Sequence, residues 1–570
     1  MRGFPLPVAF TSLSLFLMAC GGKSDELAER VRISIAHLVV SDSLSFMAGE
    51  GGEHHTQVEA FYRKRAFDAA WVGVDGPNEL LRDVLSVLCE ADEVGLNRLE
   101  YVNRRLKSRI DAAYGAEAPD DSLRAWNLAR LDVSLTNTLM DYAADVLTGR
   151  LDPREAGTAW HTPVREIDLL AVITDTTSGA SLRSLSRIQA RRHPQFGKLI
   201  DALGRYRAVM TKGGWPLVPD GEQINSDDTG PRVAALIARL AATGDIDSSF
   251  VAATADSARY TERIARGVER FQERHGMEAD GIAGEEVIRI MNVDVDARIR
   301  QIELNLERWR WIPPHLGSRY VYVNVPAFEL HAVENGEEAM SMAVVVGEEY
   351  QDNATPVFSD TMEYVVFNPY WNVPETIASS EILPDARDDL DYLSENGYEI
   401  AAGWHEGADV VSPDRDALDL VESGEYRIRQ VPGPQNALGR IKFMFPNDFN
   451  IYLHDTPEAH LFDRTRRAYS HGCIRVERPV DLADFVLTSD EWGSDSIKRR
   501  MDSGKQATEY IDDPLPVYIL YWTAFVDDDG RVNFREDIYN NDFALLEALD
   551  ALVPAREGIS CESIVLALDD

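Results

Sequence analysis

The apolar residues of this chain change their spacing once, at the proline pair Pro313-Pro314. From about Val58 to Trp311 they recur every three or four positions, which is typical of amphipathic helices. From Tyr320 the period becomes two, in short segments rich in β-branched and aromatic side chains, which predicts strands. A chain of 570 residues, 45% of them hydrophobic, can bury more than one core. The sequence therefore predicts a multidomain α+β protein that is helical first and β-rich later.

The helical part divides into successive segments. Residues 56–215 carry helical stripes and predict a helical domain. Residues 228–294 predict a small domain of three helices, in which Asp280-Gly281 marks a turn. Residues 298–313 predict a linking helix that ends at the prolines.

The β-rich part spans residues 318–540 and predicts a β-sandwich. Residues 374–430 interrupt it with a charged stretch that has no clear period, and long insertions of this kind often form lids. The expected strands are Tyr320–Val325, Met342–Gly347, Glu363–Phe367, Phe443–Phe445 and Pro514–Ala524.

His454 and Cys473 lie in one segment of the chain. The residues beside them are of the types found in thiol active sites. A thiol attacks a carbonyl as its thiolate, and an imidazole can take the proton, hold the thiolate as an ion pair and return the proton to a leaving amine. Gly472 permits a tight turn, which we expect to leave N–H groups free to face an oxyanion. Arg475 offers a charged fork that suits a substrate carboxylate.

Two other interpretations fit the same residue types. A lone cysteine is often only part of a core. A zinc site is the second alternative, although neither a CxxC nor an HExxH pair is present and bound zinc would occupy the thiolate. Its ligands would be His454, His460, His471 and Cys473.

The strings Tyr452-Leu453-His454-Asp455-Thr456-Pro457 and Ser470-His471-Gly472-Cys473-Ile474-Arg475 resemble the signature of the L,D-transpeptidase catalytic domain, the YkuD family. This resemblance implies that Cys473 is the nucleophile and His454 the general base. It also implies that no metal and no organic cofactor is needed. The supporting positions, which include the oxyanion site and the substrate carboxylate site, are Tyr452, Ser470, His471, Gly472 and Arg475.

The string from Phe271 to Gly276, followed by Asp280-Gly281-Ile282-Ala283-Gly284, resembles the three-helix peptidoglycan-binding domain. The scaffold segment 56–215 and the string Asn305–Trp311 resemble the large YcbB-like L,D-transpeptidases. In that subfamily the insertion, here 374–430, caps the substrate cleft. The resemblance assigns substrate binding to Tyr370, Trp371 and Asn436, although Tyr370 and Trp371 are equally well explained by packing at the base of the insertion.

The first residues have the form of a secretory signal, with one basic residue before an apolar stretch too short to span a bilayer. The ending Leu17-Met18-Ala19-Cys20 resembles a bacterial lipobox, which implies that residues 1–19 are removed and Cys20 is lipidated. Ordinary cleavage that leaves an unmodified cysteine is the alternative. The protein would be anchored on the periplasmic side, and Gly21 favours the outer membrane over the inner. Residues 20–55 predict a polar tether.

The formal net charge of −39 argues against a nucleic-acid partner, because phosphate binding requires a basic surface. The last residues, 541–570, predict an acidic C-terminal tail. Four cysteines are too few for a disulfide framework, and the sequence leaves open whether Cys89 and Cys561 form a bridge.

These features together predict an enzyme that acts on peptidoglycan. The resemblance implies that the Cys473 thiolate attacks the third residue of a tetrapeptide stem, releases the terminal D-Ala and passes the acyl group to an amine on a second stem, so that peptidoglycan stems are both donor and acceptor. The product would be a 3–3 crosslink, and carbapenems would acylate the same sulfur. The alternatives are an L,D-carboxypeptidase, an enzyme that joins stems to a lipoprotein lysine or releases it, and a non-catalytic wall-anchoring lipoprotein.

Overall fold

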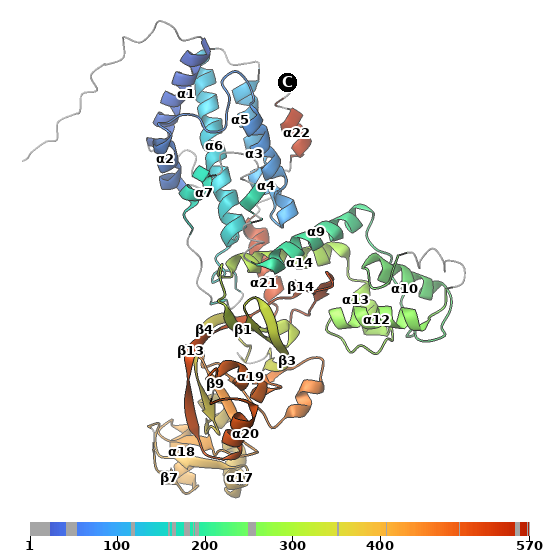
Figure 1. Ribbon diagram of the computed structural model, residues 1–570, viewed down its shortest axis with the longest axis vertical. Helices are drawn as coiled ribbons and strands as arrows, with labels where there is room; N and C mark the ends of the chain where they lie inside the picture. The colour runs from blue at the N-terminus through green and yellow to red at the C-terminus, as the bar shows by residue number, and fades with distance from the viewer. Residues whose placement is uncertain are drawn as a thin grey trace, which may run out of the picture. The chain divides into compact units, whose positions relative to one another are not determined.

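The computed structural model describes residues 23–40, 54–115, 120–157, 160–161, 167–175, 183–185, 187, 193–248, 258–349, 353–405, 407–489, 491–552, 559–566 and 568 (Figure 1). The chain forms two compact units. The first contains residues 1–150, 166–189 and 553–570, and the second contains residues 151–165 and 190–552.

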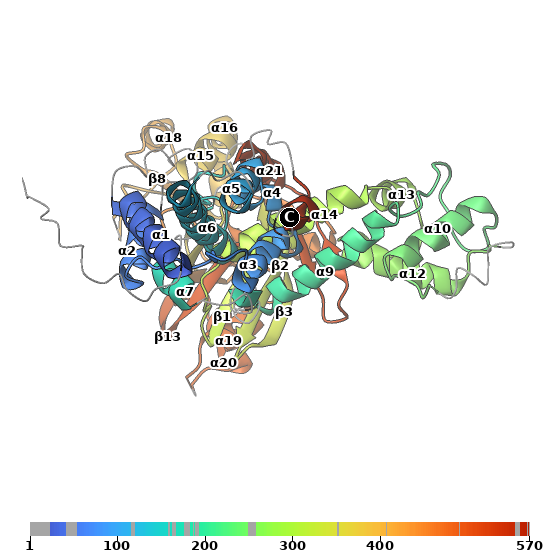
Figure 2. The same cartoon turned by 90° about the horizontal axis from the view of Figure 1, so that it is seen from above.

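The first unit is helical. Its longest helix, α6 (Asp121–Thr148), runs beside α1 (Lys23–Val40), which buries Leu27, Val31 and Ile35 at helical spacing (Figures 1 and 2). The prediction of a polar tether over residues 20–55 was therefore wrong for 23–40, where an apolar stripe makes a packed helix. The other elements are α2 (His55–Lys64), α3 (Glu79–Cys89), η3 (Ala91–Val94), α4 (Arg98–Tyr101), α5 (Arg104–Tyr114), α7 (Leu169–Asp175) and α22 (Cys561–Leu566).

A buried carboxylate on α6 fixes the loop after α2. Asp132 is fully buried and accepts hydrogen bonds from the backbone N–H groups of Ala70, Trp71 and Val72 at 2.8 to 3.1 Å. The hydroxyl of Tyr62 donates a fourth at 2.6 Å. Burial raises the pKa of this carboxyl, and the hydrogen bonds act in the opposite direction.

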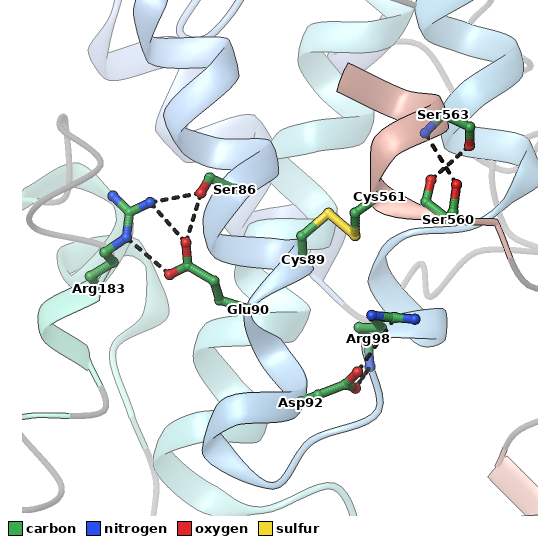
Figure 3. Close-up of a disulfide and its surroundings, with 9 residues drawn as sticks. All are labelled: Ser86, Cys89, Glu90, Asp92, Arg98, Arg183, Ser560, Cys561 and Ser563. Carbon is green, nitrogen blue, oxygen red and sulfur yellow. Dashed lines mark hydrogen bonds and ion pairs between the residues drawn. A yellow bond between two sulfur atoms is a disulfide. The ribbon is translucent and has the colours of Figure 1, made fainter. Parts of the chain in front are cut away.

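A disulfide ties the C-terminal segment to the first unit. Cys89 at the end of α3 is bonded to Cys561 at the start of α22 (Figure 3), which decides the pairing that the sequence left open. Beyond it, Ile564 and Leu568 are buried. The prediction of a tail over residues 541–570 was therefore wrong for this helix.

In the second unit, α10 (Pro231–Ala242), α12 (Glu262–Arg274) and α13 (Glu285–Met291) enclose a core of their own around Phe271. The motif residue Gln272 binds Asp280 Oδ1 at 2.7 Å and accepts the Gly281 N–H at 2.9 Å, and Gly281 has φ +68°. These motif residues therefore hold the turn between two of the helices.

Three further helices pack with the β-rich part of the same unit. They are α9 (Pro194–Thr211), which lies in the segment predicted for the helical domain, α14 (Val295–Trp311) and α21 (Asn541–Leu552). The buried Arg308 of α14 forms an ion pair with Asp542 of α21 at 2.5 Å. The segment 541–552 is thus a packed helix, where the sequence predicted a tail.

The β-rich part forms one sheet of nine strands in the order β11-β3-β12-β10-β9-β4-β13-β1-β2. Strand β2 also pairs with β3, so the sheet folds back onto itself around a buried core that includes Val321, Phe443 and Leu453. The strands are β1 (Arg319–Asn324), β2 (Glu329–Glu334), β3 (Glu337–Gly347), β4 (Phe358–Phe367), β9 (Ile441–Met444), β10 (Leu453–His454), β11 (Ala468–Ser470), β12 (Ile474–Val476) and β13 (Ala507–Leu520). Around them lie η4 (Val325–Ala327), η6 (Ala459–Asp463), α19 (Pro479–Val486), α20 (Ser494–Asp502) and the hairpin β14 (Ala524–Val526) and β15 (Val532–Phe534).

The insertion is a folded element with a small core of its own, built around Leu393, Leu418 and Ile428. Its strands pair in the order β5-β8-β6-β7. The strands are β5 (Trp371–Asn372), β6 (Tyr398–Ala401), β7 (Val410–Val411) and β8 (Arg427–Gln430), and the helices are α15 (Glu375–Ile377), the π-helix η5 (Ala378–Ile382), α16 (Leu383–Asp388), α17 (Asp391–Glu395) and α18 (Arg415–Glu422).

The predicted fold class is confirmed. A helical N-terminal region is followed by the small helical domain and then by the β-rich domain. No helix among the described residues is long and apolar enough to cross a bilayer. Cys20 and the expected signal segment lie outside the described residues.

Candidate active site

Three adjacent strands bring a histidine, an arginine and a lysine into one row. His454 on β10 pairs with Arg475 on the parallel strand β12 and with Lys442 on the antiparallel strand β9. Their neighbours Leu453 and Ile474 point into the core and are fully buried. Because side chains alternate along a strand, the row lies on the opposite face of the sheet from the core.

Cys473 immediately precedes this row and is a half-buried free thiol. Its Sγ lies 3.6 Å from the Asn450 carbonyl oxygen. Burial raises the pKa of the thiol, whereas hydrogen bonds from the backbone and hydroxyl of Tyr452 lower it, as do the charges of Lys442 and Arg475. Burial therefore keeps the thiol protonated at rest. The neighbouring hydrogen-bond donors and cations would stabilise its thiolate.

His454 is held as a neutral base. It is buried, and its Nδ1 lies 2.6 Å from the Asp455 carbonyl oxygen, so Nδ1 carries the proton and Nε2 has the free lone pair. Burial and the charges of Arg475 and Lys442 lower its pKa to about 3. The expected ion pair between an imidazolium and the Cys473 thiolate is therefore disfavoured at rest, because the ring is buried and two cations lie close to it.

Hydrogen bonds within the loop hold the backbone before Cys473 in place. The buried Ser470 accepts the Gly472 N–H at 3.2 Å and donates to the Cys473 carbonyl at 2.5 Å. Gly472 has φ +107°, and a Cβ there would lie 3.2 Å from Ile451, so glycine is required. Of the N–H groups that we expected to be free at this turn, that of Gly472 is therefore engaged by Ser470. Among the described residues, no backbone acceptor engages the Cys473 N–H.

Two of the predicted site residues have a glutamate as their partner. His471 is exposed, and its Nε2 lies 2.7 Å from Glu381 on the π-helix η5 of the insertion. Arg475 forms an ion pair with Glu458, which occupies part of the fork predicted to bind a carboxylate. His471 thus connects the insertion to the catalytic loop.

The aromatic residues at the base of the insertion differ in role. The Trp371 side chain hydrogen bonds to Tyr452, and its ring lies 6.4 Å from that of Tyr398 in the insertion. Tyr370 lies under the guanidinium of Arg429 at 4.6 Å. Trp371 thus contacts a site residue and also packs on the insertion, whereas the contact of Tyr370 is within the insertion.

Asn436 holds the surrounding backbone together by hydrogen bonds, and its predicted role in substrate binding does not fit the structure. The side chain is 1% exposed. Its Nδ2 donates to the carbonyls of Pro369, Gln430 and Val431 at 3.0 to 3.3 Å, and its Oδ1 accepts the Leu438 N–H at 2.8 Å. A side chain with its hydrogen-bonding groups used in this way has none left for a ligand.

The structure adds residues that the sequence did not indicate. Lys442, Glu381 and Glu458 contact the predicted site from segments that carry no motif of their own. The buried Thr355 donates its hydroxyl to the Gly472 carbonyl at 2.8 Å and so positions the catalytic loop. The only signal in the sequence is the polar Lys442 between the apolar Ile441 and Phe443. Within the described residues, no group of three or more His, Cys, Asp or Glu side chains is placed to hold a metal ion.

Comparison with known proteins follows the same division of the chain. Residues 318–514 match the model of the L,D-transpeptidase catalytic domain, YkuD, and residues 56–203 match that of the scaffold domain. Residues 229–291 match the model described as "Putative peptidoglycan binding domain".

Individual relatives cover parts of the chain. A curated Haemophilus influenzae protein named "Putative L,D-transpeptidase" is 34% identical over 244 residues, which are 43% of this chain and 48% of that protein. The chain thus spans about half the length of this relative. A crystal structure of an L,D-transpeptidase from Xylanimonas cellulosilytica aligns with 53% of this chain and 99% of its own, at 14% identity and a TM-score of 0.17. The chain therefore carries an L,D-transpeptidase (YkuD) catalytic domain over residues 318–514, together with a scaffold domain and a peptidoglycan-binding domain.

Proposed function

We propose that this protein is a cysteine-dependent L,D-transpeptidase that forms 3–3 crosslinks between peptidoglycan stems. The observation that carries the proposal is the arrangement of Cys473, Tyr452 and His454. A free thiol accepts hydrogen bonds from Tyr452, and a neutral imidazole with a fixed tautomer lies on the adjacent strand. This combination supplies a nucleophile, an oxyanion donor and a base within the matched catalytic domain.

In the first step the sulfur of Cys473 attacks the carbonyl of the third stem residue. The thiol proton passes to His454 Nε2, and from there to the amine of the departing D-Ala, so a thioester and free D-Ala are formed. The Tyr452 hydroxyl and the Cys473 N–H stabilise the oxyanion, each by about 3 kcal/mol if well placed. In the second step the side-chain amine of an acceptor stem attacks the thioester, loses a proton to His454 and regenerates the thiol.

Several features support an exported enzyme of the YcbB-like subfamily. The scaffold domain, the peptidoglycan-binding domain and the folded insertion occur in one chain with the catalytic domain. The disulfide between Cys89 and Cys561 suits an oxidising compartment such as the periplasm. We further propose lipidation of Cys20, an outer-membrane anchor on the periplasmic side, peptidoglycan as the ligand of the small helical domain and acylation of Cys473 by carbapenems.

The direct test is to incubate the purified chain with disaccharide-tetrapeptide and identify the products by mass spectrometry. We expect a dimer joined through the two third residues, and we expect no dimer with Cys473→Ala at an unchanged circular dichroism spectrum. Tripeptide without dimer would replace the proposal with L,D-carboxypeptidase activity. Crosslinking by the Cys473→Ala variant would exclude the thioester route.

A further inference from the structure

A lysine that belongs to no motif lies within the active site. Lys442 is in the middle of β9, where it pairs with His454 of β10 on one side and with Val366 of β4 on the other. Its neighbours Ile441 and Phe443 are fully buried in the core. The Lys442 side chain therefore lies on the face of the sheet that carries the catalytic row.

The ammonium of Lys442 lies against the tyrosine that contacts the nucleophile. Its Nζ is 3.5 Å from the centre of the Tyr452 ring, a cation–π distance. The same ring packs edge-on against the His454 ring at 5.7 Å and hydrogen bonds to the Cys473 sulfur through its hydroxyl. Tyr452 thus connects a cation directly to the thiol.

No carboxylate among the residues that the structure describes balances the charge of Lys442. Within the described residues no ion pair includes it, whereas Arg440 and Arg475 nearby pair with Asp502 and Glu458. The ionisable groups that contact Lys442 or share its row are His454, Tyr452, Arg475 and Cys473, and of these only the phenol and the thiol can become anions.

The pKa values of the neighbouring groups indicate which anion Lys442 stabilises. Burial lowers the pKa of Lys442 to about 8, and the charge of Cys473 is the one group that raises it. Burial also raises the pKa of Tyr452 well above its usual value, so its phenol stays neutral. The thiolate is therefore the anion that can offset the cost of keeping a half-buried, unpaired ammonium charged.

We propose that Lys442 is a positioning residue whose ammonium stabilises the Cys473 thiolate across the Tyr452 ring, in the place that an imidazolium would take in a Cys–His ion pair. When the thiol ionises below the pKa of Lys442, its proton leaves to solvent and Lys442 keeps its own proton. His454 thereby remains a neutral base. The inference rests on the proposed role of Cys473 as the nucleophile.

The test measures the thiol itself and needs no peptidoglycan. The full chain is alkylated with iodoacetamide from pH 6 to 11, because burial raises the pKa of the thiol, and the rate at Cys473 is followed by mass spectrometry of its peptide. Loss of the cation makes the thiolate harder to form. We therefore expect Lys442→Met and Lys442→Gln to shift the midpoint of the pH–rate curve up by about one unit, which is about a tenfold lower rate at pH 7.

The matched variants separate charge from packing. Lys442→Arg keeps the charge, so we expect its midpoint to lie closer to that of the wild type than to that of the neutral variants. Lys498→Met, at an exposed lysine on α20, should leave the curve unchanged. Only variants with the wild-type circular dichroism spectrum are compared, and either neutral variant is sufficient.

An unchanged midpoint in a folded neutral variant would overturn the proposal, and so would a Lys442→Arg curve that matches the neutral variants. These outcomes are independent of the crosslinking assay. A failure of the transpeptidase function would appear there as missing product, even when the thiol titrates as expected.

Discussion

Tyr452 is the residue on which the contacts of the site converge. Its hydroxyl hydrogen bonds to Cys473 and receives a hydrogen bond from Trp371, while its ring faces Lys442 and His454. A phenol held by so many neighbours is already positioned when substrate arrives. It can transfer its hydrogen bond from the sulfur to the oxyanion as the sulfur attacks.

Removing that hydroxyl should slow acylation more than it weakens binding. We expect Tyr452→Phe to lower kcat for crosslinking about 100-fold, because an oxyanion donor acts mainly in the transition state, with a smaller change in KM. Steady-state kinetics on disaccharide-tetrapeptide measures both. Tyr469→Phe is the control, since this exposed tyrosine lies in the same region. An unchanged kcat in Tyr452→Phe would remove Tyr452 from the oxyanion site.

At the scale of elements, the site depends on very short strands. Strand β10 has two residues, and β12 has three. Elements this short cannot hold a register alone, so their position comes from the flanking strands β9 and β3 and from the braces at Ser470 and Thr355. The insertion adds a further connection through Glu381 and His471.

In the helical unit, the Asp132 carboxylate holds the loop after α2 in a similar way. Asp132→Asn should destabilise the unit by about 2 kcal/mol, because an amide presents N–H donors where the loop also presents N–H donors. We expect faster hydrogen exchange at Ala70, Trp71 and Val72, measured by mass spectrometry. Asp121→Asn, at an exposed position in the first turn of α6, should leave this exchange unchanged. Equal protection of the loop in wild type and Asp132→Asn would contradict the assignment.

At the scale of the whole molecule, the disulfide joins positions 472 residues apart. Glu90 lies next to Cys89 and pairs with Arg183, so several segments of the first unit meet at this end of α3 (Figure 3). The bridge keeps α22 on the unit that contains α3, although the chain passes through the entire second unit between them.

Thiol labelling of the unreduced chain should therefore distinguish the three cysteines of the described region. We expect iodoacetamide to modify Cys473, and to modify Cys89 and Cys561 only after reduction, as read by mass spectrometry of the peptides. In Cys561→Ser, Cys89 should react without reductant, and the segment 561–566 should exchange its amide hydrogens faster. Labelling of Cys89 in the native wild-type chain would show that the bridge is not formed.

The strands and the candidate nucleophile were predictable because they depend on local pattern. The period-two segments became β1, β3, β4 and β9, and the motif placed His454 on β10 and Cys473 directly before the neighbouring strand β12. Residues 23–40 were misjudged because the polar and glycine-bearing stretch around them outweighed the stripe of Leu27, Val31 and Ile35. Asn436 was misjudged because a motif position does not reveal whether its amide faces a ligand or the backbone.

The sequence by itself determined the order of helical and β-rich parts, the family of the catalytic domain and the residue types of its site. These depend on spacing and motif, which are written along the chain. Only the tertiary structure decided that Lys442 lies beside Tyr452, that Glu381 meets His471 and that Cys89 is bonded to Cys561. Such contacts join segments distant in sequence, and they depend on strand register and on burial of charge, which no local pattern encodes.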